Sequence, residues 1–271
     1  MAARHAQSRA RRRLSRRSKA VSGLALSTLV GTALWAWPAS GDDHNGRPDA
    51  KSGSARTVSS PNTPAPAQAA PEAARGLRAI PELGDAARKR IPANARQVLV
   101  VTGKGPDSYE SKVVLYTRAE GSDLWQAGPG WAAHNAAHGW TTRHHYGDLR
   151  SPQGVYALTD AGGRLPAPDG TKLPYDHNSS FVAHGTGVEG EPLAGAFDYV
   201  IAINYNRVPG TSPLDGQRPL GDEKGGGVWL HVDHDGPTQG CVSLKPQVMR
   251  ELLRTLDPEL HPVVVMGPAG N

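Results

Sequence analysis

The sequence predicts a mostly β domain over residues 96–268 with one amphipathic helix, preceded by an export leader and a low-complexity linker. Short runs rich in β-branched and aromatic residues, separated by Gly, Pro and Asp, fill this range. One stretch with apolar residues at helical spacing follows the single cysteine. The range spans about 175 residues, a length typical of one domain.

Residues 1–41 have the order of regions that is typical of a secretory signal. An Arg-rich start is followed by an uncharged apolar run from Val21 to Trp37, a break at Pro38 and small residues up to Gly41. The apolar run is somewhat shorter than the roughly 20 residues of a membrane span. We therefore expect a cleaved signal peptide, with an uncleaved anchor as the alternative.

The positive charge of the chain is confined to this leader. The net charge is +5, but residues 1–41 hold 8 of the 30 basic residues and no acidic one, which leaves 22 basic against 25 acidic residues. A mildly acidic body lacks the basic surface that binds phosphate backbones, so the sequence predicts no nucleic-acid partner. It also indicates no protein partner.

Residues 42–75 are rich in Ala, Pro, Ser and Thr, with hardly a large apolar side chain. Such a segment buries too little surface to offset its ordering entropy, and it predicts a disordered linker. Residues 76–95 are expected to connect the linker to the domain, as one helix or as a cover over the domain edge.

Each predicted element of the domain has its own signal. The first two strands are Val-rich and are joined through a turn at Pro106, Asp107 and Ser108; the later strands combine β-branched or aromatic residues with flanking breakers. The helix begins at Pro246, and its apolar residues recur at helical spacing until Asp257 and Pro258 end it. The predicted strands are residues 97–102, 112–117, 122–127, 154–158, 180–184, 199–203, 228–232 and 262–266.

The lone cysteine, Cys241, is the candidate nucleophile. An exported protein with one Cys forms no internal disulfide, and an exposed thiol there is open to oxidation; the count alone fits a nucleophile or a small buried apolar residue, and the local sequence decides between them. His231, at the end of a predicted strand, is the natural base for it. Gly240 allows close backbone approach, and we expect local positive potential to favour the thiolate.

Two segments carry a resemblance to a known family. The run from Leu230-His231 to Thr238-Gln239-Gly240-Cys241-Val242-Ser243-Leu244 resembles the signature of YkuD-type L,D-transpeptidases. The upstream run from Gly147 to Tyr156 is similar to a Gly-Asp-x-x-Thr-Pro-x-Gly-x-Tyr segment of the same domains. The resemblance covers roughly residues 96–268 and implies a YkuD-like β-sandwich or barrel.

The resemblance implies an exported cell-wall enzyme that needs no metal or cofactor. Cys241 would be acylated by the tetrapeptide stem of peptidoglycan with loss of D-alanine, and a second stem would accept the acyl group in a 3→3 crosslink. His231 would be the general base. Thr238 would lie in the site, and backbone N–H groups around Gly240 would form the oxyanion hole.

This sequence departs from the family pattern in two places. Gln239 stands where the family has a His before Gly-Cys, and the loop from His231 to Cys241 is short. An L,D-carboxypeptidase, with water as acceptor, and an inactive wall-binding module are therefore alternatives. A zinc metallopeptidase that uses His231, His234 and His184 is a third, although the spacing of these residues matches no zinc signature.

Three further residues are predicted from their positions alone. His184 ends a predicted strand and is a candidate for the substrate cleft, as is Tyr205, which precedes a long Gly- and Pro-rich loop. His144 lies in a polar loop, and we expect its side chain to be solvated.

Overall fold

The structure, a computed structural model, describes residues 76–270. The predicted leader and linker lie outside these residues. The helices and strands are α1 (Asp85–Arg90), β1 (Gln97–Gly103), β2 (Glu110–Thr117), β3 (Gln126–His134), β4 (Trp140–Thr141), β5 (Ser151–Pro152), β6 (Gly154–Ala157), β7 (Ala161–Gly163), β8 (Tyr175–His177), β9 (Val200–Ala202), β10 (Trp229–Val232), β11 (Val242–Leu244), α2 (Pro246–Thr255) and β12 (Val263–Pro268), with short 3-10 helices η2 (Asp222–Lys224) and η3 (Pro258–Leu260).

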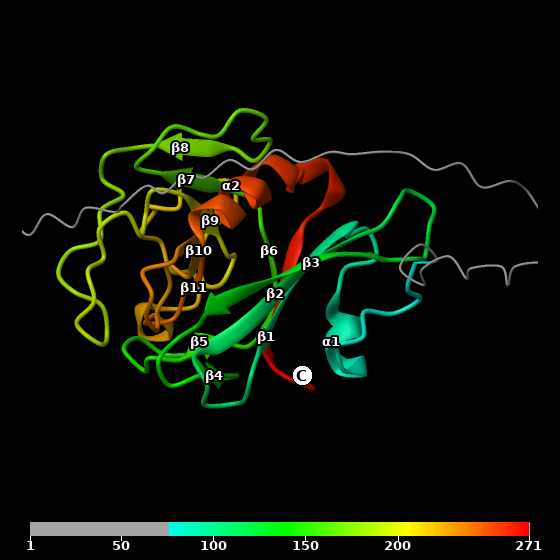
Figure 1. The fold of residues 1–271 in the computed structure, drawn as a ribbon, viewed down its shortest axis with the longest axis horizontal. Coiled ribbons are helices and arrows are strands. Elements are labelled where there is room, and N and C mark those ends of the chain that lie inside the picture. The colour runs from blue at the N-terminus through cyan, green and yellow to red at the C-terminus, as the bar shows by residue number, and fades with distance from the viewer. Residues whose placement is uncertain (1–75, 271) are drawn as a thin grey trace, which may run out of the picture. The chain divides into compact units, whose positions relative to one another are not determined.

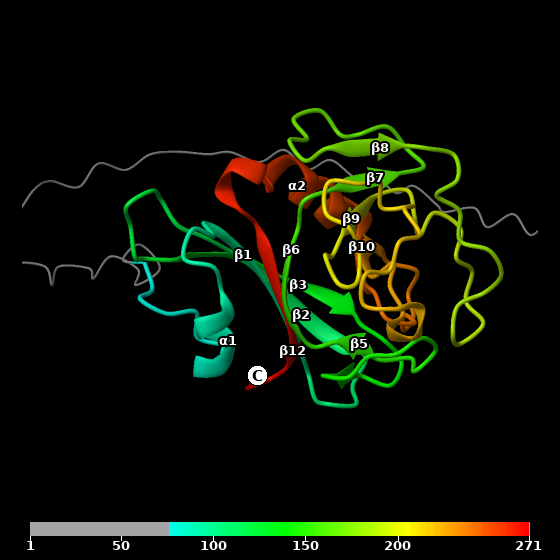
Figure 2. The ribbon, with the colours of Figure 1, turned by 180° about the vertical axis from the view of Figure 1, so that it is seen from behind.

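The strands form one curled ten-stranded sheet and a separate two-stranded pair, β4–β5. The order in the large sheet is β6-β12-β1-β2-β3-β11-β10-β9-β7-β8. The sheet is mixed, because β1–β12, β10–β11 and β7–β8 pair in parallel while the other neighbours are antiparallel. Figure 2 shows the sheet from behind, with β6 running beside β12. The predicted mostly β class is therefore confirmed.

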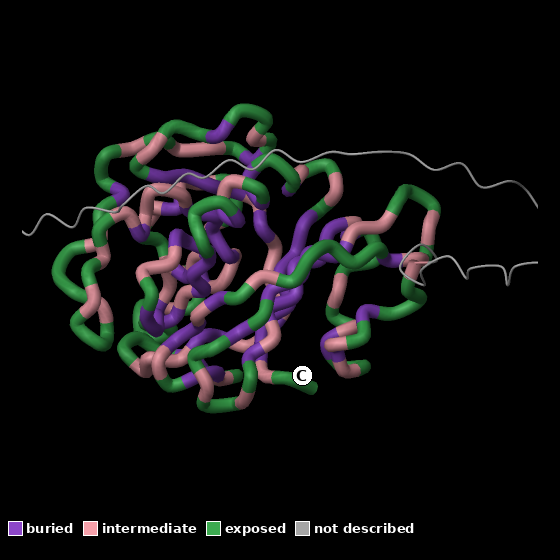
Figure 3. Tube along the Cα trace, in the orientation of Figure 1, coloured by how far each residue is buried: buried purple, intermediate pink, exposed green. Residues whose placement is uncertain are grey.

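Strand β1 is buried on both faces, which explains its unbroken apolar sequence. Leu99 and Val101 belong to a core cluster shared with β9–β11 and α2. Val98 and Val100 face a second cluster, which contains Ile80, Leu83 and Ala87 of the segment around α1. Residues 76–95 thus cover the outer face of the sheet. Figure 3 shows that the buried residues lie mainly along the central strands.

Helix α2 closes the other side of the fold, away from α1 (Figure 1). Its buried residues, Val248, Met249, Leu252 and Leu253, recur at the spacing of one helix face. Pro246 begins the helix, where its missing N–H leaves no intrahelical bond unmade. The predicted helix is confirmed. Within residues 76–270, no helix combines the length and the apolar composition needed to cross a membrane.

Two predicted strands are wrong in position or existence. Residues 122–125 precede the strand, and β3 instead runs from Gln126 through Gly128, Pro129 and Gly130, residues that normally mark a turn. Residues 180–184 form no strand. Five short strands, β4, β5, β7, β8 and β11, were not predicted; β11 lies directly between Cys241 and the helix.

Candidate active site

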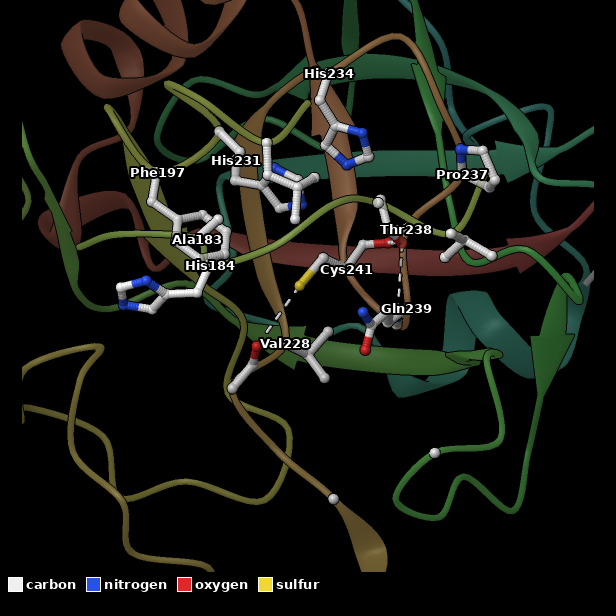
Figure 4. A pocket seen from close by; sticks show the side chains of 18 of the residues that line it. Ala183, His184, Phe197, Val228, His231, His234, Pro237, Thr238, Gln239 and Cys241 are labelled. Atoms are coloured by element: carbon white, nitrogen blue, oxygen red, sulfur yellow. Dashed lines mark hydrogen bonds between the residues drawn. The ribbon is translucent and has the colours of Figure 1, made fainter. Parts of the chain in front are cut away.

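One cavity of about 420 Å³ contains most of the residues singled out in the sequence. Four chain segments, around residues 144, 182–197, 225–228 and 231–241, supply its walls. Figure 4 shows the central part of this cavity, where Cys241, His231, His184 and Gln239 all lie at the lining. Its volume is within the range of small-molecule sites.

The turn before Cys241 is fixed by side-chain hydrogen bonds. Thr238 Oγ1 donates to the Cys241 carbonyl at 2.7 Å and accepts from the Gly240 N–H at 3.3 Å. Ser151 Oγ also donates to the Cys241 carbonyl, at 3.2 Å, and accepts from the Ala136 N–H at 3.0 Å. The Cys241 backbone is thus held by hydrogen bonds from two side chains, Thr238 and Ser151.

The same turn is pinned to the end of β3. The Thr238 N–H donates to the Asn135 carbonyl at 2.9 Å, and the Ala137 N–H donates to the Thr238 carbonyl at 3.0 Å. Strand β11 then pairs in parallel with β10, with Val242 beside Leu230 and Ser243 beside His231. His231 lies on β10 and Cys241 immediately precedes the adjacent strand β11, which is how a ten-residue separation in sequence becomes a shared cavity.

The thiol of Cys241 is protonated in this environment. Burial raises its pKa to about 11, and a 3.4 Å contact with the Trp229 N–H offsets this only in part. The thiol donates toward the Gly227 carbonyl at 3.6 Å, and in Figure 4 the sulfur lies between that carbonyl and the His231 ring. The positive potential expected to favour the thiolate is thus outweighed by burial, which keeps the thiol protonated in the resting state.

His231 is buried, and burial lowers its pKa to about 4. Its Nδ1 lies 2.9 Å from the Val232 carbonyl, which can only accept, so Nδ1 carries the proton of the neutral ring. Nε2 is then left with a free lone pair. The ring is packed edge-on against Phe197, whose centroid is 5.4 Å away. Such an imidazole can take a proton from a nearby thiol.

A second histidine stacks on His231. The His234 ring is nearly parallel to it, with centroids 5.6 Å apart. His234 Nδ1 lies 3.1 Å from Glu191 Oε1, and both side chains are largely buried. A Cβ at Gly187 or Gly236 would overlap the Glu191 carboxylate, so these glycines make room for it.

His144 also lines the cavity, so the expectation that it is solvated is wrong. Its side chain is 7% exposed, and Nδ1 lies 3.0 Å from Asp148 Oδ1. The ring is covered by Tyr205, with centroids 5.3 Å apart in an edge-on arrangement. Tyr205 itself is not among the lining residues; its hydroxyl donates to the Lys224 carbonyl at 2.9 Å. It supports the wall rather than forming it.

The remaining predicted site residues are all found at the cavity. Thr238, Gln239, Gly240 and His184 line the cavity, with the Gln239 and His184 side chains on its exposed part. Other lining residues were not predicted as part of the site: His144, Phe197 and the run Gly225–Gly227, whose three glycines all have positive φ. The glycine run was a visible signal; the burial of His144 was not, because it depends on contacts with residues far along the chain.

The donor atoms of the site do not form a metal centre. In the part of the chain that the structure describes, no three His, Cys, Asp or Glu side chains are grouped as metal ligands. His231 and His234 stack face to face, an arrangement in which their ring nitrogens do not converge on one point.

Comparison of the chain with models of known protein families finds no match, and comparison with curated proteins finds no relative.

Proposed function

We propose that this protein is a cysteine acyltransferase of the L,D-transpeptidase type, exported to the cell wall. The observation that supports this most directly is that a partly buried thiol and a neutral imidazole share one cavity, with His231 on β10 and Cys241 immediately before the adjacent strand β11. A neutral thiol and a neutral imidazole need no stable ion pair before the substrate binds; the proton moves as the sulfur attacks.

The donor half-reaction follows from these protonation states. His231 Nε2 takes the proton of Cys241 as sulfur bonds to the carbonyl carbon between the stem diamino acid and D-alanine. The tetrahedral intermediate collapses, the C–N bond breaks, and the D-alanine amine leaves with the proton from His231. A thioester remains on Cys241. Backbone N–H groups near Gly240 are the proposed donors to the oxyanion.

The acceptor half-reaction distinguishes the transpeptidase from its nearest alternative. An amine of a second stem attacks the thioester and gives a 3→3 crosslink, whereas water gives an L,D-carboxypeptidase. The partners proposed for the protein are therefore peptidoglycan tetrapeptide stems, as donor and acceptor. The proposed fold is the YkuD-like one, and the curled mixed sheet with α2 behind the site is compatible with it.

Intact-protein mass spectrometry with a disaccharide-tetrapeptide tests the proposal. We expect a thioester adduct on the wild-type protein, released D-alanine and a 3→3 dimer, with no adduct on Cys241→Ala. An adduct with only tripeptide product would make the protein a carboxypeptidase. No adduct and no product would favour an inactive wall-binding module. Activity lost to a chelator but retained after iodoacetamide would favour a zinc metallopeptidase.

A second variant tests the role of the base. We expect His231→Gln to slow acylation by about 10²- to 10⁴-fold while the fold is retained. His177→Gln is the matched control, because His177 is an exposed histidine that does not line the cavity. An acylation rate in His231→Gln equal to that of the control would remove His231 from this role.

A further inference from the structure

Two of the histidines that line the cavity, His231 and His144, have opposite electrostatic surroundings. His231 has a backbone carbonyl at Nδ1 and a second histidine against its face. His144 has a carboxylate at Nδ1, 3.0 Å from Asp148 Oδ1, and both side chains are 7% exposed. His144 Nδ1 and Asp148 Oδ1 are close enough for electrostatic attraction, but they are not aligned as a hydrogen bond.

Asp148 is itself held firmly in place. Its Oδ1 accepts from the Arg150 N–H at 2.9 Å, and its Oδ2 accepts from the His145 N–H at 3.1 Å. The carboxylate therefore stays beside the ring of His144. A positive charge on His144 is stabilised by this neighbour, whereas a positive charge on His231 meets no carboxylate at its own nitrogens.

The edge of His144 opposite Asp148 faces glycines. A Cβ built on Gly225 would lie 3.0 Å from Nε2, and one built on Gly240 would lie 3.6 Å from Cε1. Gly240 directly precedes the nucleophile, and both glycines line the cavity. Backbone rather than side chains of these two residues therefore lies along the Nε2 edge, and His144, Gly225 and Gly240 all line the cavity that contains Cys241.

We propose that His144, supported by Asp148, is the base that removes a proton from the acceptor ammonium in the second half-reaction. This rests on the proposed acyl transfer. It separates two tasks: His231 moves the thiol proton, and His144 activates the amine. Burial lowers the pKa of His144, so the ring is neutral and able to accept a proton when the acceptor arrives.

The step balances as follows. The acceptor R–NH₃⁺ gives one proton to His144 Nε2, and the resulting imidazolium is stabilised by Asp148. The neutral amine attacks the thioester carbonyl and the C–N bond forms. The C–S bond then breaks, and the second amine proton passes through His231 to the Cys241 sulfur. The products are the amide, the free thiol and one proton, which His144 returns to solvent.

A comparison of two acceptors tests this division. A stem carrying an aliphatic amine arrives as an ammonium ion, since such amines have a pKa of about 10.4. Hydroxylamine is largely unprotonated at neutral pH and needs no base. The acyl-enzyme is formed from the tetrapeptide donor, and transfer to each acceptor is followed by mass spectrometry of protein and product.

We expect His144→Gln to lower transfer to the stem amine by about 100-fold while transfer to hydroxylamine is nearly unchanged. Asp148→Asn, which keeps an oxygen for the backbone N–H groups, should show the same selectivity to a smaller degree. The matched control is His145→Gln, because His145 is an exposed neighbour; both transfers should stay as in the wild type.

Equal loss with both acceptors, or no loss with either, would overturn the role of His144. These results differ from failure of the proposed function, in which the wild-type protein forms no acyl-enzyme at all. If His144→Gln does not fold, the acceptor selectivity of Asp148→Asn decides the question, and an unchanged ratio in that variant counts against the proposal.

Discussion

Glu191 and His234 connect the rim of the cavity to the loop that carries the nucleophile. Glu191 Oε1 lies 3.1 Å from His234 Nδ1, and Glu191 Oε2 accepts from the Glu189 N–H at 2.9 Å. The Gly187 N–H also donates to the Glu191 carbonyl at 2.8 Å, which closes the turn between these residues. The Glu191 carboxylate therefore holds this turn against His234. Because His234 stacks on His231, this contact also supports the base.

We expect Glu191→Ala to loosen this rim. Loss of a largely buried carboxylate leaves His234 without its partner, at a cost of about 1–3 kcal/mol. Hydrogen exchange of residues 182–192 should become faster and acylation slower, while the central strands keep their protection. Glu189→Ala is the control, because the Glu189 side chain is exposed. Unchanged exchange in Glu191→Ala would mean that other contacts hold the rim.

The single thiol offers a direct measurement of its own ionisation. Since the chain has one cysteine, all iodoacetamide labelling reports on Cys241. With a pKa near 11, the thiolate fraction should rise about tenfold per pH unit across the range from 6 to 10. Alkylation followed by mass spectrometry should show this rise without a plateau. A plateau beginning near pH 7 would reveal a stable thiolate instead.

His231 should make the stability of the fold depend on pH. Its pKa is about 4 in the folded protein and near the ordinary 6.5 when unfolded, so below pH 6.5 the unfolded state binds a proton that the folded state does not. Stability is therefore full above pH 6.5 and falls as the pH approaches 4, by about 3 kcal/mol from this group. Urea unfolding of wild type and His231→Gln at several pH values checks this; the variant should have the shallower slope.

Thr238 should govern how well the nucleophile is positioned. Thr238→Val keeps the shape of the side chain but removes its hydrogen bonds to the Cys241 carbonyl and the Gly240 N–H. We expect a loss of about 1–3 kcal/mol of stability and slower acylation. Thr238→Ser keeps the hydroxyl and should retain most of both. Equal effects of the two substitutions would point to the methyl group rather than the hydrogen bonds.

The sequence predicted those elements whose burial pattern is visible in their own residues. Residues 97–102 are apolar without interruption because β1 is buried on both faces, and the spacing in 246–255 reflects one buried helix face. Strand β3 was obscured by Gly128, Pro129 and Gly130, whose preference for turns is overridden by pairing with β2. Within residues 180–184, which form no strand, Val182, Ala183 and His184 line the cavity.

The site was predicted where the signal was local and missed where it was not. The approach of Cys241 to His231 follows from one turn and two adjacent strands. The protonation states do not follow from the sequence, because they depend on burial, to which Phe197 contributes from another segment by packing on His231. For His144 the decisive neighbours are Tyr205 and Gly225, more than sixty residues further along the chain.

The position of β12 has a consequence for how the chain acquires its fold. Residues 263–268, which follow every other strand in sequence, pair between β1 and β6 in the interior of the sheet. Until residues 263–268 have been synthesised, β1 and β6 each lack a strand partner on one side. Pairing residue 98 with residue 263 also closes one of the longest loops in the domain, which is slow. Folding is therefore delayed until synthesis of the domain is nearly finished. This order of events would suit the export that we propose, because the chain stays unfolded until its last strand is available.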